Sequence, residues 1–306
     1  MEPIYFNKQQ TKDLLPYSKL VPAIEQACLD YAKGEIISPN RLVTPIAKGV
    51  MLSMPASASD IAITKLINIC PENPRIGLET INGQLIIWHP VTGIPQFILD
   101  APTITAKRTA AVSMVGIKLF ASNTSVFTIY GCGIQGLNHL EALASQYPNS
   151  TVYIIGSTID KSIIFCKKHQ HLPLKLEAAE SVPPNVDVVI TTTTSLTPVY
   201  KEPAQTDRLV IAVGVFQADR AEIASKTVKD SIIFVDDLPS AVHEAGDIIQ
   251  AQINWDDVHS LEKALQIGVK RINKDNKPIL FKSVGCAAWD LAACRVAQEI
   301  LTTQSN

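Results

Sequence analysis

Between residues 125 and 237 the chain alternates short runs of apolar, mostly β-branched residues with segments of helical periodicity. The apolar runs are SVFTIY, TVYIIG, DVVITTTT, RLVIAVGV and SIIFVDD. Runs of this length without polar alternation are typical of strands buried on both faces, and their alternation with helices is typical of a parallel sheet. The sequence therefore predicts an α/β fold with a doubly wound parallel sheet.

The first of these runs leads into the glycine-rich loop GCGIQG, which has the spacing G-x-G-x-x-G at Gly131, Gly133 and Gly136. The helical segment LNHLEALASQY follows it. In this context Gly131 permits a tight turn, Gly133 lets the backbone approach a pyrophosphate, and Gly136 allows close packing of helix and strand. The start of the helix also offers free N–H groups to an anion. This arrangement predicts a dinucleotide-binding domain of the Rossmann type.

The segment after the second apolar run concerns the choice of cofactor. An acidic residue at this strand end would bind the ribose 2′-hydroxyl of NAD, whereas this run continues as GSTIDKS. Ser157 and Thr158 could bind a 2′-phosphate with help from Lys161, although Asp160 lies one turn further on. Ser157 or Thr158 would equally serve as an ordinary helix cap. We expect the cofactor to be NADPH or NADH.

The first 120 residues have a different pattern, in which turn signals separate strand-like stretches as in an antiparallel sheet. The chain ends in FKSVGCAAWDLAACRVAQEIL, whose apolar spacing suits a helix that packs against this first part. We therefore expect a mixed α+β domain of residues 1–118 plus 281–306, with the Rossmann domain of residues 119–280 inserted into it.

Charge and composition exclude several classes of partner. The formal net charge is -2 and no basic run is present, so we expect no nucleic acid and no anionic membrane as a partner. No segment approaches the roughly 18 apolar residues of a membrane span, and the N-terminus does not read as a signal peptide. Six cysteines without a C-x-x-C pair suit a reducing compartment, and we expect a cytoplasmic protein. His169 and His171 lack a third ligand at convincing spacing, so no metal is expected.

Five segments together carry a resemblance to a known family. They are SPNRLVTP, AITKLINICPENP, LDAPTITAKRTAAVSMVGIKLFA, GCGIQGLNHLEAL and FKSVGCAAWDLAA. In these segments the chain resembles the ornithine cyclodeaminase/mu-crystallin family over essentially its whole length. The resemblance implies that Arg41, Lys65 and Arg108 are the catalytic and substrate-binding residues that hold a carboxylate against the nicotinamide. It also implies a homodimer, with the first domain serving substrate binding and dimerisation.

Elementary chemistry agrees with these three cations. A small amino or imino acid presents one carboxylate, which a planar guanidinium can bind through two hydrogen bonds. Lys65 lies in the apolar run IAITKLINI and would need a buried partner, for which an anionic ligand is one candidate. If burial lowers its pKa, Lys65 could alternatively donate a proton to the substrate nitrogen.

The chain departs from the family's cyclodeaminases at two positions. Those enzymes use an aspartate after the fifth strand as a base, where this chain has Phe216, and a glutamate near the substrate amino groups, where it has Leu52. Apolar side chains cannot accept a proton, so ornithine cyclisation is disfavoured. Asp219, three residues beyond Phe216, is the acid that could take the missing role.

The sequence therefore favours an oxidoreductase that reduces small cyclic ketimines with NAD(P)H: Δ1-pyrroline-2-carboxylate to L-proline, or Δ1-piperideine-2-carboxylate to L-pipecolate. The protonated C=N is already electrophilic, so the protein chiefly has to orient it beside the hydride donor. Three alternatives stay open. They are a lyase of the ornithine cyclodeaminase type, a dehydrogenase of linear amino acids, and a mu-crystallin-like protein that binds NADP and a small ligand without turnover.

The remaining assignments complete the predicted site. Met54 and Phe216 are expected to contact the substrate. The predicted cofactor contacts are Thr80, Arg108, Gly131, Gly133, Ile134, Gln135, Gly136, Ser157, Thr158, Thr192, Val215 and Ser283. We interpret His139 as a packing residue, and Asp290 as a family position whose role, structural or catalytic, the sequence leaves open.

Overall fold

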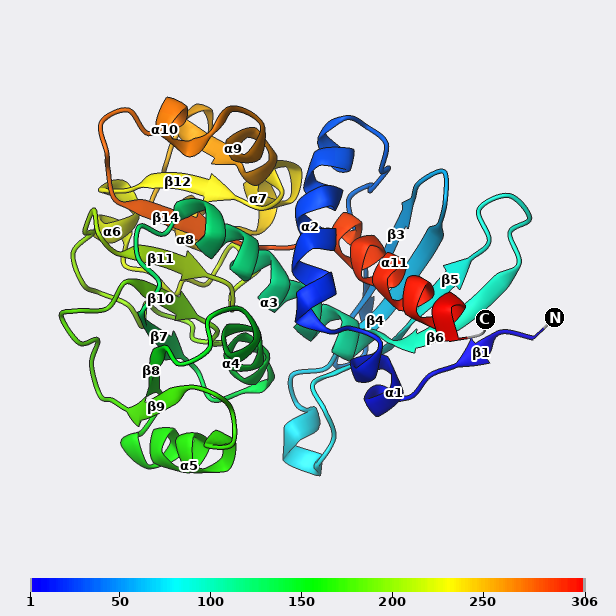
Figure 1. The fold of residues 1–306 in the computed structure, drawn as a ribbon, viewed down its shortest axis with the longest axis horizontal. Coiled ribbons are helices and arrows are strands. Elements are labelled where there is room, and N and C mark those ends of the chain that lie inside the picture. Colours follow the sequence, from blue (N-terminus) through cyan, green and yellow to red (C-terminus); the bar gives the residue numbers. More distant parts are fainter. Residues whose placement is uncertain (1, 305–306) are drawn as a thin grey trace. The chain divides into compact units, whose positions relative to one another are not determined.

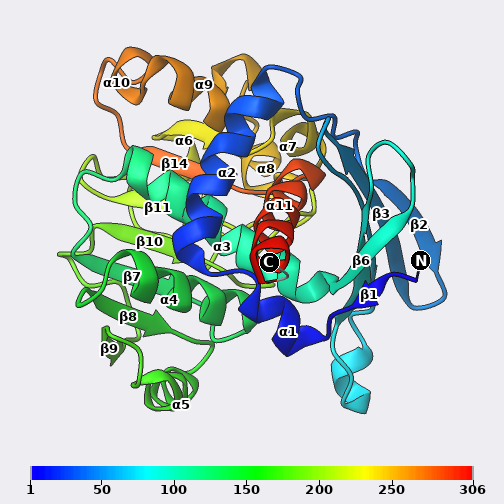
Figure 2. The same cartoon turned by 45° about the vertical axis from the view of Figure 1, so that its right-hand side comes forward.

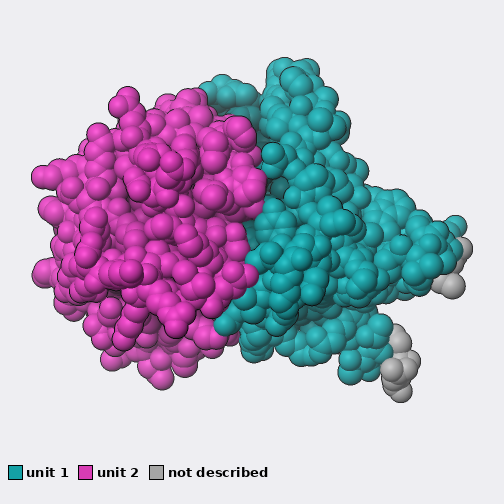
Figure 3. All heavy atoms as spheres, turned by 90° about the horizontal axis from the view of Figure 1, so that it is seen from above, with its two compact units in different colours: residues 1–108, 286–306 teal, residues 109–285 magenta. Residues whose placement is uncertain are grey.

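A computed structural model describes residues 2–304 of the 306-residue chain. Contacts divide the chain into two units, one of residues 1–108 and 286–306 and one of residues 109–285 (Figure 3). The first division falls inside helix α3 (Ala101–Phe120), which supplies residues to both units. The boundaries predicted from the sequence, at residues 118 and 280, place all of α3 except its last two residues in the first domain.

Unit 1 is built on a six-stranded sheet with the order β1-β6-β5-β4-β3-β2. Its strands are β1 (Ile4–Tyr5), β2 (Leu42–Ile46), β3 (Gly49–Ser57), β4 (Ala62–Ile69), β5 (Ile81–Trp88) and β6 (Pro95–Asp100). The strands β2 to β6 are antiparallel, and β1 pairs with β6 in parallel. The other elements of this unit are α1 (Lys8–Asp13), α2 (Tyr17–Ala32), the 3-10 turn η1 (Asn73–Ile76) and α11 (Ala287–Gln304).

One face of this sheet is covered by the C-terminal helix. Helix α11 packs on α2 and against β3 and β4, so this late helix completes the core begun by the first hundred residues (Figures 1 and 2). Side chains alternate across a strand with a period of two. In β4 this places Ile63, Lys65 and Ile67 on the buried face and Leu66 on the exposed face.

Unit 2 contains an eight-stranded sheet with the order β13-β12-β14-β11-β10-β7-β8-β9, and every pairing in it is parallel. Its strands are β7 (Val126–Tyr130), β8 (Thr151–Ile155), β9 (Lys175–Ala178), β10 (Val188–Thr191), β11 (Leu209–Ala212), β12 (Ile232–Val235), β13 (Val258–Ser260) and β14 (Ile279–Lys282). The helices are α4 (Ile134–Gln146), α5 (Ile159–His169), α6 (Ser225–Lys229), α7 (Leu238–Glu244), α8 (Gly246–Gln250), α9 (Leu261–Ile267) and α10 (Val269–Ile272), with a 3-10 turn η2 (Trp255–Asp257).

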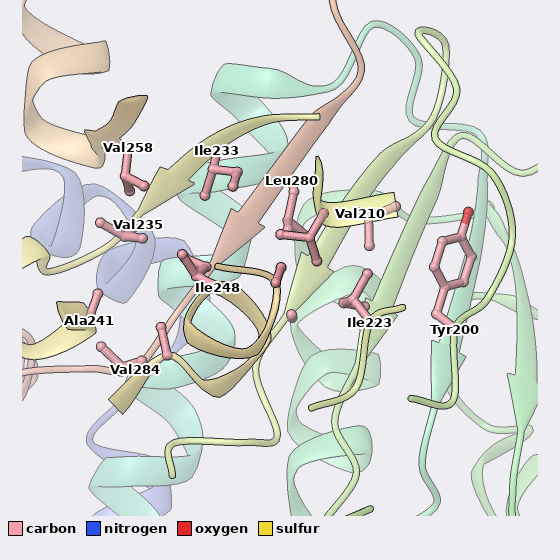
Figure 4. Packing of buried hydrophobic residues seen from close by; sticks show 14 of the residues in the cluster. Tyr200, Val210, Ile223, Ile233, Val235, Ala241, Ile248, Val258, Leu280 and Val284 are labelled. Carbon is pink, nitrogen blue, oxygen red and sulfur yellow. The ribbon is translucent and has the colours of Figure 1, made fainter. Parts of the chain in front are cut away.

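The core of unit 2 follows from the apolar runs of the sequence. All four residues of β10 and of β11 are buried, as expected for central strands of a parallel sheet. Figure 4 shows how Val210, Ile233 and Leu280 from neighbouring strands pack with Ile223 and Ile248 from the segments that cover them. The predicted fold class, a doubly wound parallel sheet joined to a mixed α+β part, is confirmed.

None of the helices in residues 2–304 combines the length and the apolar character that a membrane-spanning segment requires.

Candidate functional site

The glycine loop between β7 and α4 contains three glycines, and the physical reason for a glycine differs among the three positions. Gly131 has a φ of 113°, a backbone conformation that favours glycine, and a Cβ there would lie 2.6 Å from Thr192 Oγ1. A Cβ on Gly136 would lie 2.1 Å from the carbonyl oxygen of Gly131. The chain itself therefore requires these two glycines. Gly133 is different, because a Cβ there would have no atom within 4 Å.

The space at Gly133 adjoins the first turn of α4, which fits the pyrophosphate of a dinucleotide. Gly133 is the N-cap and supplies no side-chain cap, so the first N–H groups of the helix are left for an anion. In the same turn, the Oε1 atom of Gln135 is buried and has no hydrogen-bond partner among the described residues. A buried polar atom without a partner calls for an explanation, and a bound ligand would supply one.

The end of β8 carries the residues predicted to meet the adenosine ribose. Lys161 Nζ donates a hydrogen bond to Ser157 Oγ at 2.9 Å. Thr158 is the N-cap of α5 and accepts a bond from the Lys161 backbone N–H at 3.4 Å. The sequence allows Thr158 to be either a helix cap or a phosphate ligand, and the structure shows it as the helix cap. Ser157 and Lys161 form an exposed pair with the right chemistry for a 2′-phosphate.

A cavity of about 450 Å³ lies between the glycine loop and α5, lined by Cys132, Gly133, Ile134, Leu137, Lys161, Ile164, Phe165, Lys168 and His169. Burial raises the pKa of the Cys132 thiol, and the nearby Lys161 lowers it by less. A thiol with a raised pKa is a poor nucleophile near neutral pH. Cys132 therefore contributes mainly its backbone to this loop.

The other predicted cofactor residues of unit 2 lie where parallel strands end. Thr192 follows β10 and donates through Oγ1 to the Tyr130 carbonyl at 2.8 Å. Val215 lies three residues after β11, and Ser283 directly after β14. In parallel sheets of this kind, ligands bind outside the carboxyl ends of the strands. Thr80 belongs to unit 1, in the bend before β5. These cofactor assignments stay predictions.

Unit 1 brings two of the three predicted cations together at a single carboxylate. The Lys65 Nζ atom lies 2.6 Å from Asp290 Oδ2, and Arg108 Nε donates to Asp290 Oδ1 at 3.0 Å. Lys65 comes from β4, Arg108 from α3 and Asp290 from the first turn of α11. Lys65 is 1% exposed and Asp290 is completely buried. We call Lys65, Arg108 and Asp290 the buried ion cluster.

The electrostatics of the buried ion cluster favour an incoming anion. Burial lowers the pKa of Lys65 to about 8; the Asp290 carboxylate raises it, while Arg108 and Arg41 lower it. Arg41, half-buried in the segment before β2, is therefore near enough for its charge to act on Lys65. Lys65 and Arg108 share the single Asp290 carboxylate, so a substrate carboxylate would find a net positive cluster.

The cluster also leaves donors for that carboxylate. Asp290 engages Arg108 through Nε, and in residues 2–304 the two Nη groups of Arg108 make no hydrogen bond or ion pair. A guanidinium held at Nε can present its Nη groups to a second anion. The role of Asp290, which the sequence leaves open, is thus to hold both cations. An acid inside the apolar run AAWDLAAC is the signal for it.

The residues predicted around the substrate fall into both units. Met54 of β3 is paired with Lys65 across the antiparallel ladder and shares its buried face. Leu52, where the family's cyclodeaminases have a glutamate, is also buried on that face. Phe216 lies half-buried in the loop after β11 of unit 2, and Asp219 is exposed.

Two further candidates from the sequence have plain structural explanations. His139 is buried, with Nε2 2.9 Å from Ser113 Oγ and Nδ1 2.8 Å from the Gln135 carbonyl. Burial lowers its pKa to about 4, so it is neutral near pH 7 and packs as expected. Within residues 2–304, no group of histidine, cysteine, aspartate and glutamate side chains could hold a metal ion.

Comparison with known families identifies the family of the chain. A family model described as the ornithine cyclodeaminase/mu-crystallin family matches residues 2–305. The chain belongs to this family. The resemblance read from the arginine, lysine and glycine motifs is therefore confirmed.

Similar proteins in the ornithine cyclodeaminase/mu-crystallin family include reductases. The Δ1-pyrroline-2-carboxylate/Δ1-piperideine-2-carboxylate reductase of Azospirillum brasilense is 46% identical over 303 residues, which cover 98% of this chain and 96% of that protein. The structure of Thermococcus litoralis Δ1-pyrroline-2-carboxylate reductase in complex with NADH and L-proline matches with a TM-score of 0.89. It is 26% identical and covers 99% of this chain and 98% of that chain. An archaeal alanine dehydrogenase dimer with bound NAD matches at 27% identity and a TM-score of 0.89, covering 100% of this chain and 98% of that chain.

Proposed function

We propose that this chain is an NAD(P)H-dependent reductase that converts Δ1-pyrroline-2-carboxylate to L-proline and Δ1-piperideine-2-carboxylate to L-pipecolate. The observation that carries the proposal is the buried ion cluster, in which Asp290 holds an ammonium and a guanidinium side by side. Together these two cations suit one small substrate carboxylate. The Azospirillum relative, 46% identical over nearly the whole chain, is a reductase of the same two ketimines.

The reaction places modest demands on the protein. When bound, the dihydronicotinamide supplies a hydride to C2 of the protonated C=N, and the π electrons of that bond move to nitrogen to give the amine. The Nη groups of Arg108 and the Lys65 ammonium bind the ring carboxylate and so fix the position of C2. Orientation of this kind supplies much of the rate enhancement in a two-reactant step. Met54, beside Lys65, provides an apolar wall for the ring methylenes.

The same site is poorly suited to cyclodeaminase chemistry. A base for the second amine of ornithine would have to replace Leu52 or Phe216, and neither side chain can accept a proton. Asp219, the acid that could take that role, is exposed on its loop. The apolar positions favour a substrate without a second amino group.

The cofactor is NADPH or NADH. The cradle at Gly133 and the first turn of α4 receive the pyrophosphate, which both cofactors share. Ser157 and Lys161 donate hydrogen bonds to the 2′-phosphate of NADPH. No acidic residue at the end of β8 repels that phosphate.

We also propose that the protein is a cytoplasmic homodimer joined through unit 1. The sheet face away from α11 exposes Leu42 and Leu66, which lie in one cross-strand row. Exposed apolar side chains on a sheet face suit a subunit interface, and the similar alanine dehydrogenase is a dimer. The six cysteines are all free thiols, as in a reducing compartment. The mass in solution, measured by light scattering, tests the dimer.

One assay decides the main proposal. Purified protein is mixed with NADPH or NADH and Δ1-pyrroline-2-carboxylate, and cofactor oxidation is followed by absorbance; a parallel assay measures ammonia from L-ornithine with NAD⁺. We expect oxidation with the ketimine and no ammonia. Ammonia without ketimine reduction would show a lyase instead, and binding without any turnover would show a ligand-binding protein.

Replacing Arg41 with alanine is expected to raise KM for the ketimine by about 10- to 100-fold with a smaller effect on kcat. The guanidinium contributes to carboxylate binding in both ground and transition states, and loss of a charged hydrogen bond costs about 1.5–3 kcal/mol. Steady-state kinetics at saturating NADPH measure the effect. An unchanged KM would remove Arg41 from the substrate site.

A further inference from the structure

Unit 2 contains a second group of buried charges that the proposed mechanism does not use. Glu222, Asp247 and Lys282 are each 0–1% exposed. They come from the loop after β11, from α8 and from the end of β14. We call these three residues the loop-tying triad.

Lys282 begins a chain of contacts through this triad. Its Nζ atom donates to the Val215 carbonyl at 2.5 Å and lies 2.9 Å from Asp247 Oδ2. The other carboxylate oxygen of Asp247 accepts the backbone N–H groups of Glu222 at 2.6 Å and Ile223 at 2.8 Å. Lys282 therefore anchors the loop after β11 at two places, once directly and once through Asp247.

Glu222 extends the chain to a second loop. Its Oε1 atom accepts from the Thr193 N–H at 2.6 Å and from Thr193 Oγ1 at 2.8 Å, and its Oε2 atom accepts from the Gly214 N–H at 2.7 Å. The two loops approach closely, since a Cβ on Gly214 would lie 2.1 Å from the Thr193 carbonyl oxygen. One carboxylate thus fixes the loop after β10 against the loop after β11.

The position of the loops after β10 and β11 in the sheet indicates which half of a dinucleotide they would contact. The chain runs from β7 through β8 to β9 on one side and returns to β10, β11 and β14 on the other. A dinucleotide bound to such a sheet lies across the reversal, with one mononucleotide half on each side. The glycine loop after β7 serves the pyrophosphate, so the loops after β10 and β11 face the nicotinamide half.

A group of buried charges such as the loop-tying triad is an inefficient way to stabilise a fold, because removing charges from water offsets most of their attraction. Charged groups do, however, hold several backbone N–H and C=O groups in fixed directions. The triad directs all its described contacts to backbone groups, to Thr193 and to its own members.

We propose that Lys282, Asp247 and Glu222 are positioning residues that hold the backbone at Thr193, Gly214 and Val215 in the geometry that receives the nicotinamide half of the cofactor. The proposal rests on the proposed function, since it concerns the same dinucleotide site. The triad acts through the two loops, without touching the substrate.

The test compares Lys282→Met with Arg208→Met in the full-length protein. Arg208 is a matched control: it is also a buried cation of unit 2, and it donates to the carbonyls of Pro183, Pro184 and Val186 near the amino ends of the strands. NADPH binding is measured by fluorescence titration, and Tm by circular dichroism. Both variants are expected to lower Tm, because each leaves buried polar groups without a partner.

We expect Lys282→Met to raise the Kd for NADPH about tenfold or more, and Arg208→Met to leave it within about twofold of wild type. Equal Kd changes at equal losses of Tm, or an unchanged Kd in Lys282→Met, would overturn the positioning role. If Lys282→Met does not fold, Glu222→Gln is measured in the same way, because it keeps the side-chain size and replaces one acceptor by a donor.

The outcome for the proposed function is separate. Wild-type protein that binds NADPH but does not reduce the ketimine would overturn the reductase, while the comparison of Kd values would still decide the role of the triad. Wild-type protein that binds neither NADPH nor NADH would overturn both proposals.

Discussion

Replacing Lys65 with methionine is expected to lower kcat/KM for Δ1-pyrroline-2-carboxylate by about 10²- to 10³-fold. Methionine keeps a long, unbranched side chain in the buried position and removes the ammonium. Truncating one partner of a buried, hydrogen-bonded charge pair costs about 2–5 kcal/mol. Here Lys65 is the truncated partner, and the substrate carboxylate is the group that loses it. Steady-state kinetics at saturating NADPH measure the loss.

The matched control for this change is Lys107→Met. Lys107 is a second buried lysine of unit 1, and its Nζ atom lies 4.3 Å from the centre of the Tyr17 ring. We place it outside the substrate site, so the variant is expected to keep kcat/KM within about threefold of wild type. Equal losses in the two variants would show that any buried charge change in unit 1 has this effect, and would contradict a specific role for Lys65.

The titration of Lys65 should be visible in the pH dependence of kcat/KM for the wild-type enzyme. Its pKa is lowered to about 8, so kcat/KM is expected to fall above about pH 8 as the ammonium loses its proton. In the enzyme–substrate complex the bound carboxylate favours the charged form of Lys65 and raises its pKa. The fall of kcat with pH should therefore occur at higher pH than the fall of kcat/KM. In Asp290→Asn the carboxylate that raises the pKa is gone, so the limb of kcat/KM should move to lower pH. A limb that stays in place would belong to the ketimine nitrogen of the substrate.

The parts of the fold that the sequence predicts are those encoded locally. Apolar runs of strand length, a glycine loop and a following helix specify a parallel sheet without any knowledge of distant residues. The split of the chain inside α3 has no such signal, because one helix of uniform periodicity contributes to both units. A boundary set by long-range contacts cannot be read from the pattern of the helix that crosses it.

The candidate site divides in the same way. The resemblance to the family singles out Lys65 in the sequence, and a lysine in an apolar strand also requires a buried partner. The sequence offers an anionic ligand as the partner, whereas the structure adds Asp290 from the last helix. The two residues are far apart in the chain, and only the packing of α11 on β4 brings them together. The loop-tying triad has no sequence signal for the same reason, since its bonds join three separated segments.

Replacing Gly133 with alanine is expected to raise the Kd for NADPH by about 10- to 100-fold while leaving Tm unchanged. Its φ of -92° and ψ of -165° are open to alanine, and the added Cβ meets no protein atom within 4 Å. The new methyl group would instead occupy the space proposed for the pyrophosphate. Overpacking of a well-fitted contact costs about 1–3 kcal/mol, which corresponds to this range of affinity. Fluorescence titration with NADPH and thermal unfolding without ligand provide the two measurements.

Gly136→Ala is the comparison that separates the ligand from the fold. Its Cβ would lie 2.1 Å from the Gly131 carbonyl oxygen, so this variant should lower Tm even when no cofactor is present. A clash with the protein acts on the free chain, whereas a clash with the pyrophosphate acts only on the complex. An unchanged Kd for NADPH in Gly133→Ala would therefore show that the pyrophosphate does not bind at this loop. A fall in its Tm equal to that of Gly136→Ala would show that the space at Gly133 serves the fold instead of the cofactor.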